Sequence, residues 1–295
     1  MSSRHETYII GVDGGGSGCR VAISDTQGHI LARAEGGAAN VSTDFAASIR
    51  NILAAMETAV QQIEITLDDL GASAVHLGLA GVISDEISNR VAAALPFQNI
   101  CVTDDRPTAL AGALAGRDGS LLAIGTGVIV ATRNGTMLCC ASGWGLQVSD
   151  HGGGAWLGRR LLEEVLFCCD GLREHTALTR KISNDFSGDP AQIASFSLTA
   201  SPGDFGQFAC DIVSFASQAD NVGQMLLKSG AAYLQDNLRA TGFRAGDQLC
   251  LSGGLGPIYA AYLADEFTQD LIAPEGDALA GALQLAAGLQ AERDG

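Results

Sequence analysis

Four glycines and one serine separate two apolar runs near the start of the chain, in the segment 8–24 (YIIGVDGGGSGCRVAIS). A turn with so few side chains lets backbone N–H groups approach an anion closely and tolerates positive φ, so the segment predicts a phosphate-binding turn between two antiparallel strands. Ser17 is the one side chain in the turn, and Asp13 ends the first strand with the kind of carboxylate that Mg²⁺ prefers. A plain hairpin needs only a two-residue turn, so the extra glycines favour a functional turn.

Two familiar phosphate-binding loops do not fit this turn. A Walker loop needs a lysine after its last glycine, and the two lysines of the chain, Lys181 and Lys228, lie outside any glycine turn. A dinucleotide-binding turn continues as a helix, whereas Val21 and Ile23 alternate with other residues, as in a strand. The pattern is therefore strand, turn, strand.

Length and composition indicate a folded protein with two modest domains. The chain has 295 residues, of which 47% are hydrophobic and 17% charged. A net charge of −16 argues against nucleic acid and anionic membrane as partners, because both are negatively charged and bind basic surfaces. A nucleotide substrate stays open, since backbone amides and a divalent cation can supply local positive charge.

Cysteine usage and the apolar runs bear on the compartment. The eight cysteines include the doublets Cys139-Cys140 and Cys168-Cys169, but no C-x-x-C zinc spacing occurs. No signal peptide precedes the first apolar run, and no apolar stretch is long enough to span a membrane. We therefore expect a reduced, cytoplasmic protein without a membrane segment.

Apolar periodicity predicts strands alternating with helices after an initial meander, which indicates an α/β fold with mixed sheets. Beyond the first hairpin, we expect strands at 29–35, 74–80, 100–103 and 248–251, and the segment TMLCCAS reads as a buried strand. We expect helices from Asp44 to about Ile63 and at 85–95, 104–116, 154–168, 174–185, 204–218, 220–240 and 277–291, with a further helix from Ile258.

The strand–turn–strand pattern recurs at 120–133 (SLLAIGTGVIVATR), where the turn is Gly125, Thr126 and Gly127. The chain thus has two similar halves, and we expect the ligand site in the cleft between them. A third glycine turn, at 252–257 (SGGLGP), suits a flat ring such as adenine. Phosphoryl transfer needs amide donors, a metal ligand and a base, and the first two turns, Asp13 and a further aspartate would supply them.

Seven segments carry a resemblance to a known family: IGVDGGGSGCR (10–20), GGAAN (36–40), VTDDRPTALAGALAG (102–116), AIGTG (123–127), SDHGGGAWLG (149–158), DGLREHTAL (170–178) and GDFGQF (203–208). Their order is similar to that in the actin, sugar kinase and heat-shock ATPase superfamily. The chain resembles the BadF/BadG-type ATPases in particular, and among them the N-acetylglucosamine and bacterial glucosamine kinases. The resemblance implies two ribonuclease H-like (actin-like ATPase) domains, one at 1–116 with 277–295 and the other at 117–276.

The resemblance also implies a role for each candidate residue. Asp105 would be the catalytic base that takes the proton from the 6-hydroxyl of the sugar. Asn40, Asp105 and Asp150 would bind sugar hydroxyls, and Trp144 would line the pocket. The ATP phosphates would lie on the first two turns (Gly14, Gly15, Gly16, Ser17, Gly125, Thr126, Gly127), the adenosine on Ser252, Gly253 and Gly254, and Mg²⁺ beside Asp13, directly or through water.

These residues also have ordinary structural interpretations. Asp104 or Asp105 could simply cap the next helix, Asn40 could shape a turn, Asp150 could cap the helix near 153, and Trp144 could belong to the core.

The chain departs from the family pattern at two positions, Asp104 and Val128, and His151 stands where relatives vary. Asp104 stands where the family more often has a neutral residue, although the spacing to Gly125 favours Asp105 as the base. Val128 follows the second turn, where related kinases commonly have a serine. His151 could touch the amino-sugar substituent or be a half-exposed residue at a helix start.

The sequence therefore predicts an ATP-dependent, Mg²⁺-requiring kinase that phosphorylates the 6-hydroxyl of glucosamine or N-acetylglucosamine, without deciding between the two sugars. The resemblance further implies a homodimer. An alternative is an activator ATPase with an iron–sulfur cluster held by cysteines between two subunits. A sugar-sensing regulator is a third hypothesis, but the phosphate motif begins at residue 8, which leaves no room for a preceding DNA-binding domain.

Overall fold

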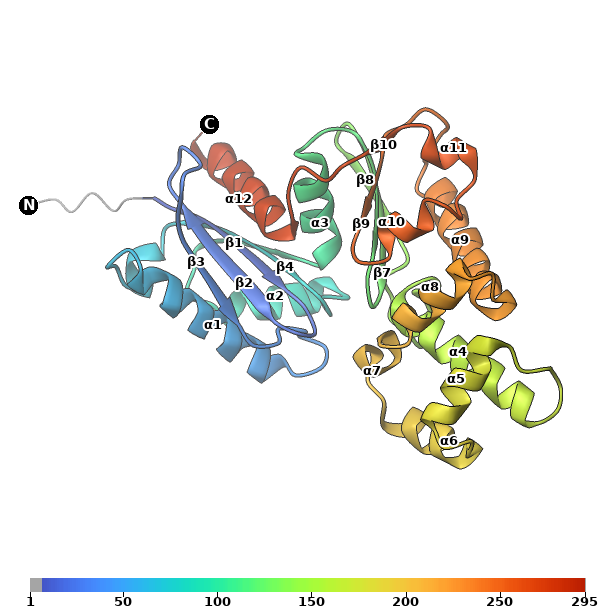
Figure 1. Ribbon diagram of the computed structural model, residues 1–295. Coiled ribbons are helices and arrows are strands. Elements are labelled where there is room, and N and C mark those ends of the chain that lie inside the picture. The colour runs from blue at the N-terminus through green and yellow to red at the C-terminus, as the bar shows by residue number, and fades with distance from the viewer. Residues whose placement is uncertain (1–6, 295) are drawn as a thin grey trace, which may run out of the picture. The chain divides into compact units, whose positions relative to one another are not determined.

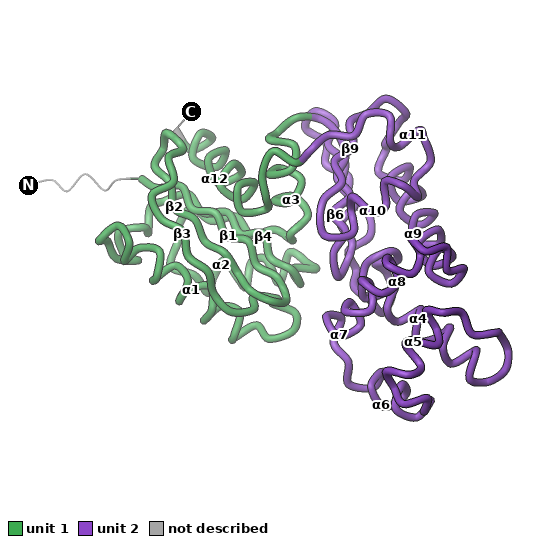
Figure 2. Tube along the Cα trace, viewed as in Figure 1, with its two compact units in different colours: residues 1–117, 274–295 green, residues 118–273 purple. Residues whose placement is uncertain are grey.

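The computed structural model describes residues 7–294, which form two compact units (Figure 2). The first unit holds the described residues up to Arg117 together with those from Pro274 onward, and the second holds Asp118–Ala273. The C-terminal segment thus returns to the first unit, and each unit has its own sheet and core.

A five-stranded mixed sheet forms the centre of the first unit (Figure 1). The glycine turn joins β1 (Ile9–Gly14) to β2 (Cys19–Ser24), and β3 (Ile30–Gly36) completes an antiparallel meander, as predicted. β4 (Ala74–Leu79) and β5 (Asn99–Thr103) lie parallel to β1, so the order is β3-β2-β1-β4-β5. Both β1 and β4 are mostly apolar because of this central position, since strands covered on both faces need no polar side.

Helices cover both faces of this sheet. Ile10 packs in a core with Met56 of α1 (Phe45–Gln61), whereas its neighbour Ile9 packs with Ala286 of α12 (Ala278–Asp294). Because successive residues of a strand point to opposite faces, α1 and α12 lie on opposite sides of the sheet (Figure 1). The other helical segments of the unit are η1 (Leu67–Leu70), α2 (Asp85–Ala93) and α3 (Asp105–Leu114).

The packing of α3 against α12 is close because glycines face each other. A Cβ on Gly112 would lie 1.9 Å from the carbonyl oxygen of Asp277, and a Cβ on Gly281 would lie 1.9 Å from that of Thr108. Any larger residue at either position would force the helices apart. The small residues of the terminal helix thus allow this tight packing.

The second unit repeats the topology of the first. β6 (Gly119–Ile124), β7 (Val128–Asn134) and β8 (Met137–Ala141) form an antiparallel meander, and β9 (Leu249–Ser252) and β10 (Leu271–Ile272) add parallel strands beside β6. The order β10-β9-β6-β7-β8 matches β5-β4-β1-β2-β3 strand for strand. The predicted duplication and the α/β fold class with mixed sheets are confirmed.

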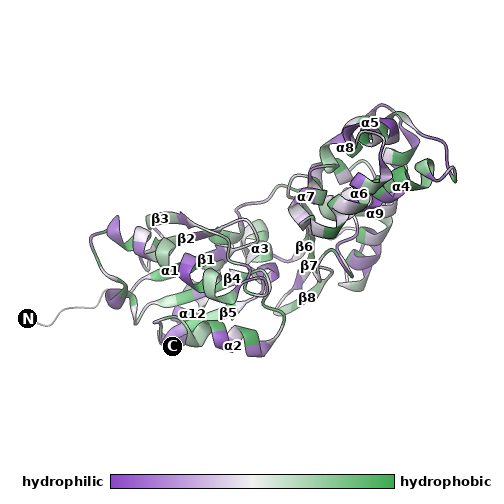
Figure 3. Ribbon diagram, turned by 90° about the horizontal axis from the view of Figure 1, so that it is seen from below, coloured by the Kyte–Doolittle hydropathy of each residue, from purple (hydrophilic) through white to green (hydrophobic). Residues whose placement is uncertain are grey.

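Most helices of the chain belong to the second unit: α4 (Gly154–Cys169), α5 (Ala177–Asp185), α6 (Pro190–Thr199), α7 (Pro202–Gly206), α8 (Ala209–Ser217), α9 (Asn221–Ala240), α10 (Gly256–Tyr259) and α11 (Asp265–Thr268). Leu226, Leu234 and Leu238 of α9 are fully buried in the core of this unit, as their spacing predicts. Hydrophobic residues are spread through both units, while α2 alternates hydrophobic and hydrophilic stretches (Figure 3).

Three sequence-based expectations for the second unit were wrong. The helix expected at 204–218 is two helices, α7 and α8. The first of them packs closely on α4, where a Cβ on Gly158 would lie 1.9 Å from the carbonyl oxygen of Phe205. Helix α6 was missed although Asp189 caps it and Pro190 begins it. β8 is an edge strand rather than a buried one, since 66% of Met137 is exposed.

None of the helices in the described chain is both long enough and apolar enough to span a membrane.

Candidate active site

The predicted residues of the first unit gather at one edge of its sheet. β1, β4 and β5 are parallel, so their carboxyl ends meet there. The first turn is tied to that edge by two backbone bonds: Ala80 N–H donates to Gly14 (2.8 Å), and Ala39 N–H donates to Gly15 (2.9 Å). Asp13, Asn40 and Asp105 all belong to segments that end or begin at this edge.

The glycines of the first turn fall into two groups. Gly14 and Gly18 are required by the protein itself, because a Cβ on Gly14 would lie 2.6 Å from Leu79 and one on Gly18 would lie 3.1 Å from the oxygen of Gly36. A Cβ on Gly15 or Gly16 would meet nothing within 4 Å. The open space beside these two glycines, at a turn closed by the bond from Gly15 N–H to Gly18 (2.9 Å), is what an anion held by backbone amides requires.

The first turn does not use the positive φ that its glycines would tolerate. None of its glycines has φ in the left-handed region. In the third turn, by contrast, Gly253 has a φ of 76°. Glycine in the first turn therefore serves close approach rather than an unusual backbone conformation.

Asp13 is held by Arg20 from the neighbouring strand. The Nη2 and Nε atoms of Arg20 donate to Oδ2 of Asp13 at 2.5 and 3.1 Å, and Nη1 donates to Asp277 at 2.6 Å. Among the described residues, no hydrogen bond ends on Oδ1 of Asp13. One carboxylate oxygen beside an anion-binding turn fits Mg²⁺, which usually takes one or two protein carboxylates and completes its shell with water and substrate phosphates.

Asp104 and Asp105 have different surroundings. Asp104 caps α3 by accepting a bond from Arg106 N–H (2.9 Å), and its carboxylate also accepts from Nε (2.8 Å) and Nη2 (2.9 Å) of Arg106. Asp105 is the first residue of α3, and burial together with the negative charges of Asp104 and Asp13 raises its pKa to about 6. The capping interpretation thus holds for Asp104, while Asp105 has the pKa of a general base near neutral pH.

Asn40 shapes a turn through its side-chain oxygen, and its side-chain nitrogen donates to none of the described residues. Its Oδ1 accepts bonds from the backbone N–H (3.1 Å) and hydroxyl (2.8 Å) of Ser42. A Cβ on Gly81, just beyond β4, would lie 2.4 Å from the same oxygen, so the side chain is fixed in place. The two N–H donors of its Nδ2 are left for an acceptor such as a sugar hydroxyl.

In the second unit, the second and third glycine turns lie side by side. Both follow parallel strands, β6 and β9, and Leu255 N–H donates to the carbonyl of Ile124 (2.9 Å). A Cβ on Gly253 would come within 2.4 Å of that carbonyl oxygen, whereas one on Gly125 or Gly254 would meet nothing within 4 Å. The N-terminus of α4 is tied to the second turn, since Gly154 N–H donates to Gly125 (2.8 Å).

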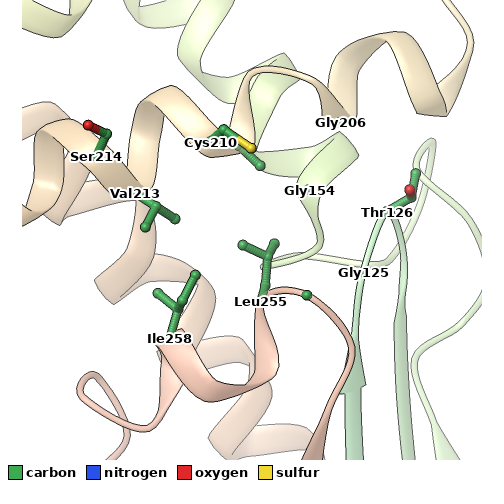
Figure 4. A pocket seen from close by; sticks show the side chains of 11 residues that line it. Gly125, Thr126, Gly154, Gly206, Cys210, Val213, Ser214, Leu255 and Ile258 are labelled. Carbon is green, nitrogen blue, oxygen red and sulfur yellow. The ribbon is translucent and has the colours of Figure 1, made fainter.

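These two turns open onto a cavity of about 430 Å³ within the second unit (Figure 4). Gly125 and Thr126 line one end, and Gly254 and Leu255 line a second side. The remaining wall comes from α8 and its neighbours, through Ala209, Cys210, Val213, Ser214, Ile258, Gly154 and Gly206. The cavity therefore joins a phosphate-type turn to an apolar space of a size that suits a nucleoside.

Asp150 lies beside the second turn. It is buried, and a Cβ on Gly127 would lie 2.7 Å from its Oδ2. Its Oδ1 accepts a bond from Gly143 N–H (3.0 Å), and its φ is 60°. Burial raises the pKa of this carboxyl, while the amides of Gly143 and Gly145 oppose the rise. Its side chain does not cap α4, whose N-cap is Gly153, so that interpretation is wrong.

Trp144 lies in the same loop and is 60% exposed, so it is not part of the core. It lies at the surface of the second unit, next in sequence to the Gly143 amide that holds Asp150. His151 is half-buried and stacks on Trp156 (5.2 Å between ring centroids) and against Tyr233 (4.6 Å).

Three hydroxyl groups lock this loop and were not identified from the sequence. The hydroxyl oxygens of Ser142, Ser149 and Tyr233 form a triangle with sides of 3.1 to 3.3 Å. Tyr233 belongs to α9, far along the chain from the two serines. Arg20 and Arg106 were likewise missed as partners of the two acidic sites; only their closeness in sequence to Asp13 and Asp104 hinted at pairing.

The cysteine doublets lie on β8 and at the end of α4. The buried thiol of Cys168 donates to the carbonyl of Glu174 (3.5 Å), as in a packed helix face. Within residues 7–294, no group of three or more His, Cys, Asp and Glu side chains could hold a metal ion.

Two units of the same topology, each with a glycine turn after its first strand, define an actin-like ATPase. More specifically, the chain belongs to the BadF/BadG/BcrA/BcrD ATPase family, whose model matches residues 10–276. The family resemblance seen in the motifs is therefore confirmed, and with it a nucleotide-dependent protein that uses ATP.

Known relatives narrow the comparison. The glucosamine kinase GspK of Vibrio cholerae is 33% identical over 280 residues, which is 95% of each chain. A solved structure from Chromobacterium violaceum, assigned as an N-acetylglucosamine kinase, is 33% identical, has a TM-score of 0.86, and matches 96% of this chain and 99% of its own. Component A of (R)-2-hydroxyglutaryl-CoA dehydratase from Acidaminococcus fermentans covers 98% of both chains but is 12% identical with a TM-score of 0.50, so it shares the fold alone.

Proposed function

We propose that this protein is an amino-sugar kinase, which transfers the γ-phosphoryl group of ATP to the 6-hydroxyl of glucosamine or N-acetylglucosamine. The observation that carries the proposal is the contrast between Asp104, paired with Arg106, and Asp105, whose pKa of about 6 suits a general base. A base at this place activates a hydroxyl nucleophile, which is water in an ATPase and an alcohol in a kinase, so the choice of an alcohol rests on the relatives. The similarity to a glucosamine kinase over 95% of the chain supports the same function.

Asp105 acts on the sugar. Its ionised carboxylate accepts the proton of the 6-hydroxyl as the hydroxyl oxygen attacks the γ-phosphorus, while the bond from that phosphorus to the bridging oxygen of ADP breaks. The proton stays on Asp105 until it passes to water after the sugar phosphate leaves. Asn40 and Asp150 orient the sugar through its other hydroxyls, with an amide donor from one and a carboxylate acceptor from the other.

The glycine turns hold the nucleotide. The backbone amides of Gly16 and Ser17 in the first turn and of Thr126 in the second bind phosphate oxygens, because those of Gly15 and Gly125 already donate to Gly18 and Gly127. The apolar cavity beyond the second turn takes the base. Val128 is buried in β7 and offers no hydroxyl. The contacts of the second turn with phosphate therefore come from its backbone and from Thr126. Mg²⁺, when bound, offsets the charge of the phosphates, and Oδ1 of Asp13 would hold it directly or through water.

Product analysis tests the proposal. Purified protein is incubated with Mg²⁺-ATP and, in turn, with glucosamine, N-acetylglucosamine, mannosamine and glucose, and the sugar phosphates are identified by phosphorus NMR. We expect the 6-phosphate of one or both glucosamine sugars, identified by coupling of phosphorus to the C6 protons. Phosphorylation of glucose alone, or at another hydroxyl, would contradict the proposal, and the same experiment selects between the two amino sugars.

The homodimer and the cytoplasmic location expected from the sequence stay predictions. Light scattering of the purified protein tests the first, and cell fractionation tests the second.

A further inference from the structure

The cavity of the second unit offers very few polar side chains to a nucleotide base. Beside four glycines, its lining consists of Ala209, Cys210, Val213, Leu255 and Ile258, and of two hydroxyl residues, Thr126 and Ser214. The lining contains no charged side chain and no amide side chain. In Figure 4, Val213, Leu255 and Ile258 surround the same space.

Neither hydroxyl is well placed to hydrogen-bond with the amino or keto groups at the edge of a base. Thr126 belongs to the phosphate turn, at the opposite end of the cavity from Ser214 and Val213 (Figure 4). The hydroxyl of Ser214 points away from the apolar side chains in Figure 4, and its oxygen lies 3.5 Å from the side-chain nitrogen of Gln218. Ser214 is thus at the rim of the cavity rather than at its centre.

Several backbone groups of the lining are already hydrogen-bonded within the protein. Ala155 N–H donates to the carbonyl of Thr126 (3.0 Å), Gly154 N–H donates to that of Gly125 (2.8 Å), and Leu255 N–H donates to that of Ile124 (2.9 Å). In α8, the N–H of Ile212 bonds to the carbonyl of Phe208, whereas Ala209 and Cys210 lie in the first turn, where N–H groups have no partner inside the helix. The lining thus keeps a few backbone N–H donors, but its side chains supply no amide or carboxylate that would distinguish the edge of one purine from another.

A binding site discriminates strongly between related molecules when its buried polar groups are matched by one of them and left unpaired by the other. Adenine, guanine and hypoxanthine share a flat apolar face and differ in the amino and keto groups at their edges. A cavity that contacts the flat face of the base and makes no hydrogen bonds to the groups at its edge gives all three bases similar free energies of binding.

We infer that this protein accepts purine nucleoside triphosphates with little regard for the base, so that GTP and ITP serve as phosphoryl donors within about tenfold of ATP in kcat/KM. The inference rests on the proposed function, because it assigns the cavity to the base of the phosphoryl donor. It also implies that the phosphate turns, rather than the base, dominate donor binding.

Donor kinetics test the inference. Initial rates of sugar phosphate formation are measured with saturating amino sugar and with Mg²⁺-ATP, Mg²⁺-GTP or Mg²⁺-ITP. We expect the three values of kcat/KM to lie within about tenfold of one another. A value for GTP or ITP more than about tenfold below that for ATP overturns the inference. If no donor phosphorylates the sugar, the proposed function has failed, and titration calorimetry with the same three nucleotides then decides base tolerance on its own.

Thiol footprinting locates the base independently of activity. Cys210 lines the cavity and is exposed, whereas Cys169, at the end of α4, is exposed but outside it and serves as the matched control. We expect Mg²⁺-ATP and Mg²⁺-GTP to slow alkylation of Cys210 by iodoacetamide equally, and neither to change alkylation of Cys169, as read by peptide mass spectrometry. Protection by ATP alone, or no protection when both nucleotides are bound, overturns the inference.

Discussion

Asp104 gives both of its carboxylate oxygens to the guanidinium of Arg106, two residues further along the chain, at 2.8 and 2.9 Å. This ion pair distinguishes the two adjacent aspartates, whereas the sequence alone does not decide which of them is the base. Asp104 caps α3 and is neutralised, so the neighbouring carboxyl of Asp105 is the one available for proton transfer.

Substitution of the two aspartates should therefore have different effects. Asp105→Asn removes the base, and we expect kcat to fall by about 10²- to 10⁴-fold while the sugar still binds. Asp104→Asn weakens a helix cap and an ion pair, and we expect it to lower the free energy of unfolding by about 1 kcal/mol while keeping most of the activity. Steady-state kinetics and thermal unfolding of both variants check this; an inactive Asp104→Asn beside an active Asp105→Asn would reverse the assignment.

The raised pKa of Asp105 predicts how activity and stability depend on pH. As a base, Asp105 must be ionised, so kcat/KM should fall tenfold per pH unit below about pH 6. A carboxyl whose pKa is higher in the folded protein than in the unfolded chain costs stability as pH rises from about 4 to 6, because the folded state resists ionisation. Asp105→Asn should thus stabilise the protein by about 3 kcal/mol at pH 8 and by less than about 1 kcal/mol at pH 4.

Thermal unfolding at pH 4 and pH 8, with wild type and Asp105→Asn side by side, measures the second effect. An equal change in melting temperature at both pH values would show that Asp105 has an ordinary pKa.

The two groups of glycines predict a separation of stability from nucleotide binding. Gly16→Ala adds a methyl group to open space at an ordinary φ, so we expect the free energy of unfolding to change by less than about 0.5 kcal/mol and KM for ATP to rise by about tenfold or more. Gly36→Ala is the matched control: its Cβ would lie 2.8 Å from Asn51 O and from Cys19 Sγ, so it should cost about 1–3 kcal/mol of stability.

Urea unfolding and ATP titration of both variants give the two quantities. If Gly16→Ala unfolds as easily as Gly36→Ala and binds ATP normally, the turn is structural.

The hydroxyl triangle predicts that Tyr233 positions the loop with Trp144 and Asp150. Tyr233→Phe removes one hydroxyl that bonds to Ser142 and Ser149, and we expect KM for the amino sugar to rise by about fivefold, with KM for ATP unchanged. Tyr262→Phe is the control, since Tyr262 packs against Tyr259 in the same unit and its hydroxyl bonds to none of the described residues. Equal behaviour of the two variants, or an increase in KM for ATP, would argue against this role.

Much of the fold follows from local sequence patterns. The apolar runs and glycine turns at 8–24 and 120–133 predict the two duplicated sheets, and caps such as Asp44 predict where helices begin. Helix α6 was missed although Asp189 and Pro190 mark its start in the sequence. The break between α7 and α8 was also missed, and the close contact of Phe205 with Gly158 of α4 joins distant segments whose proximity cannot be read from spacing.

The candidate site shows the same division. Asp13, Asn40, Asp105 and Asp150 could be nominated from motifs, since each follows or precedes a strand or turn of recognisable type. The hydrogen-bond partners of the acidic and amide groups could not be predicted. Arg106 donates to Asp104, Arg20 to Asp13, Ser42 to Asn40 and the Gly143 amide to Asp150. Those partners depend on rotamers and on loop conformation, which hydrophobic periodicity does not encode.

The most direct test of the account compares ATP turnover with glucosamine, with 6-deoxyglucosamine and without sugar. A kinase that acts on the 6-hydroxyl should form ADP and glucosamine 6-phosphate in equal amounts with the first sugar, and no phosphorylated sugar with the 6-deoxy analogue. ADP formed at the same rate in all three reactions, without any sugar phosphate, would contradict the account and identify an ATPase whose turnover is independent of an amino sugar.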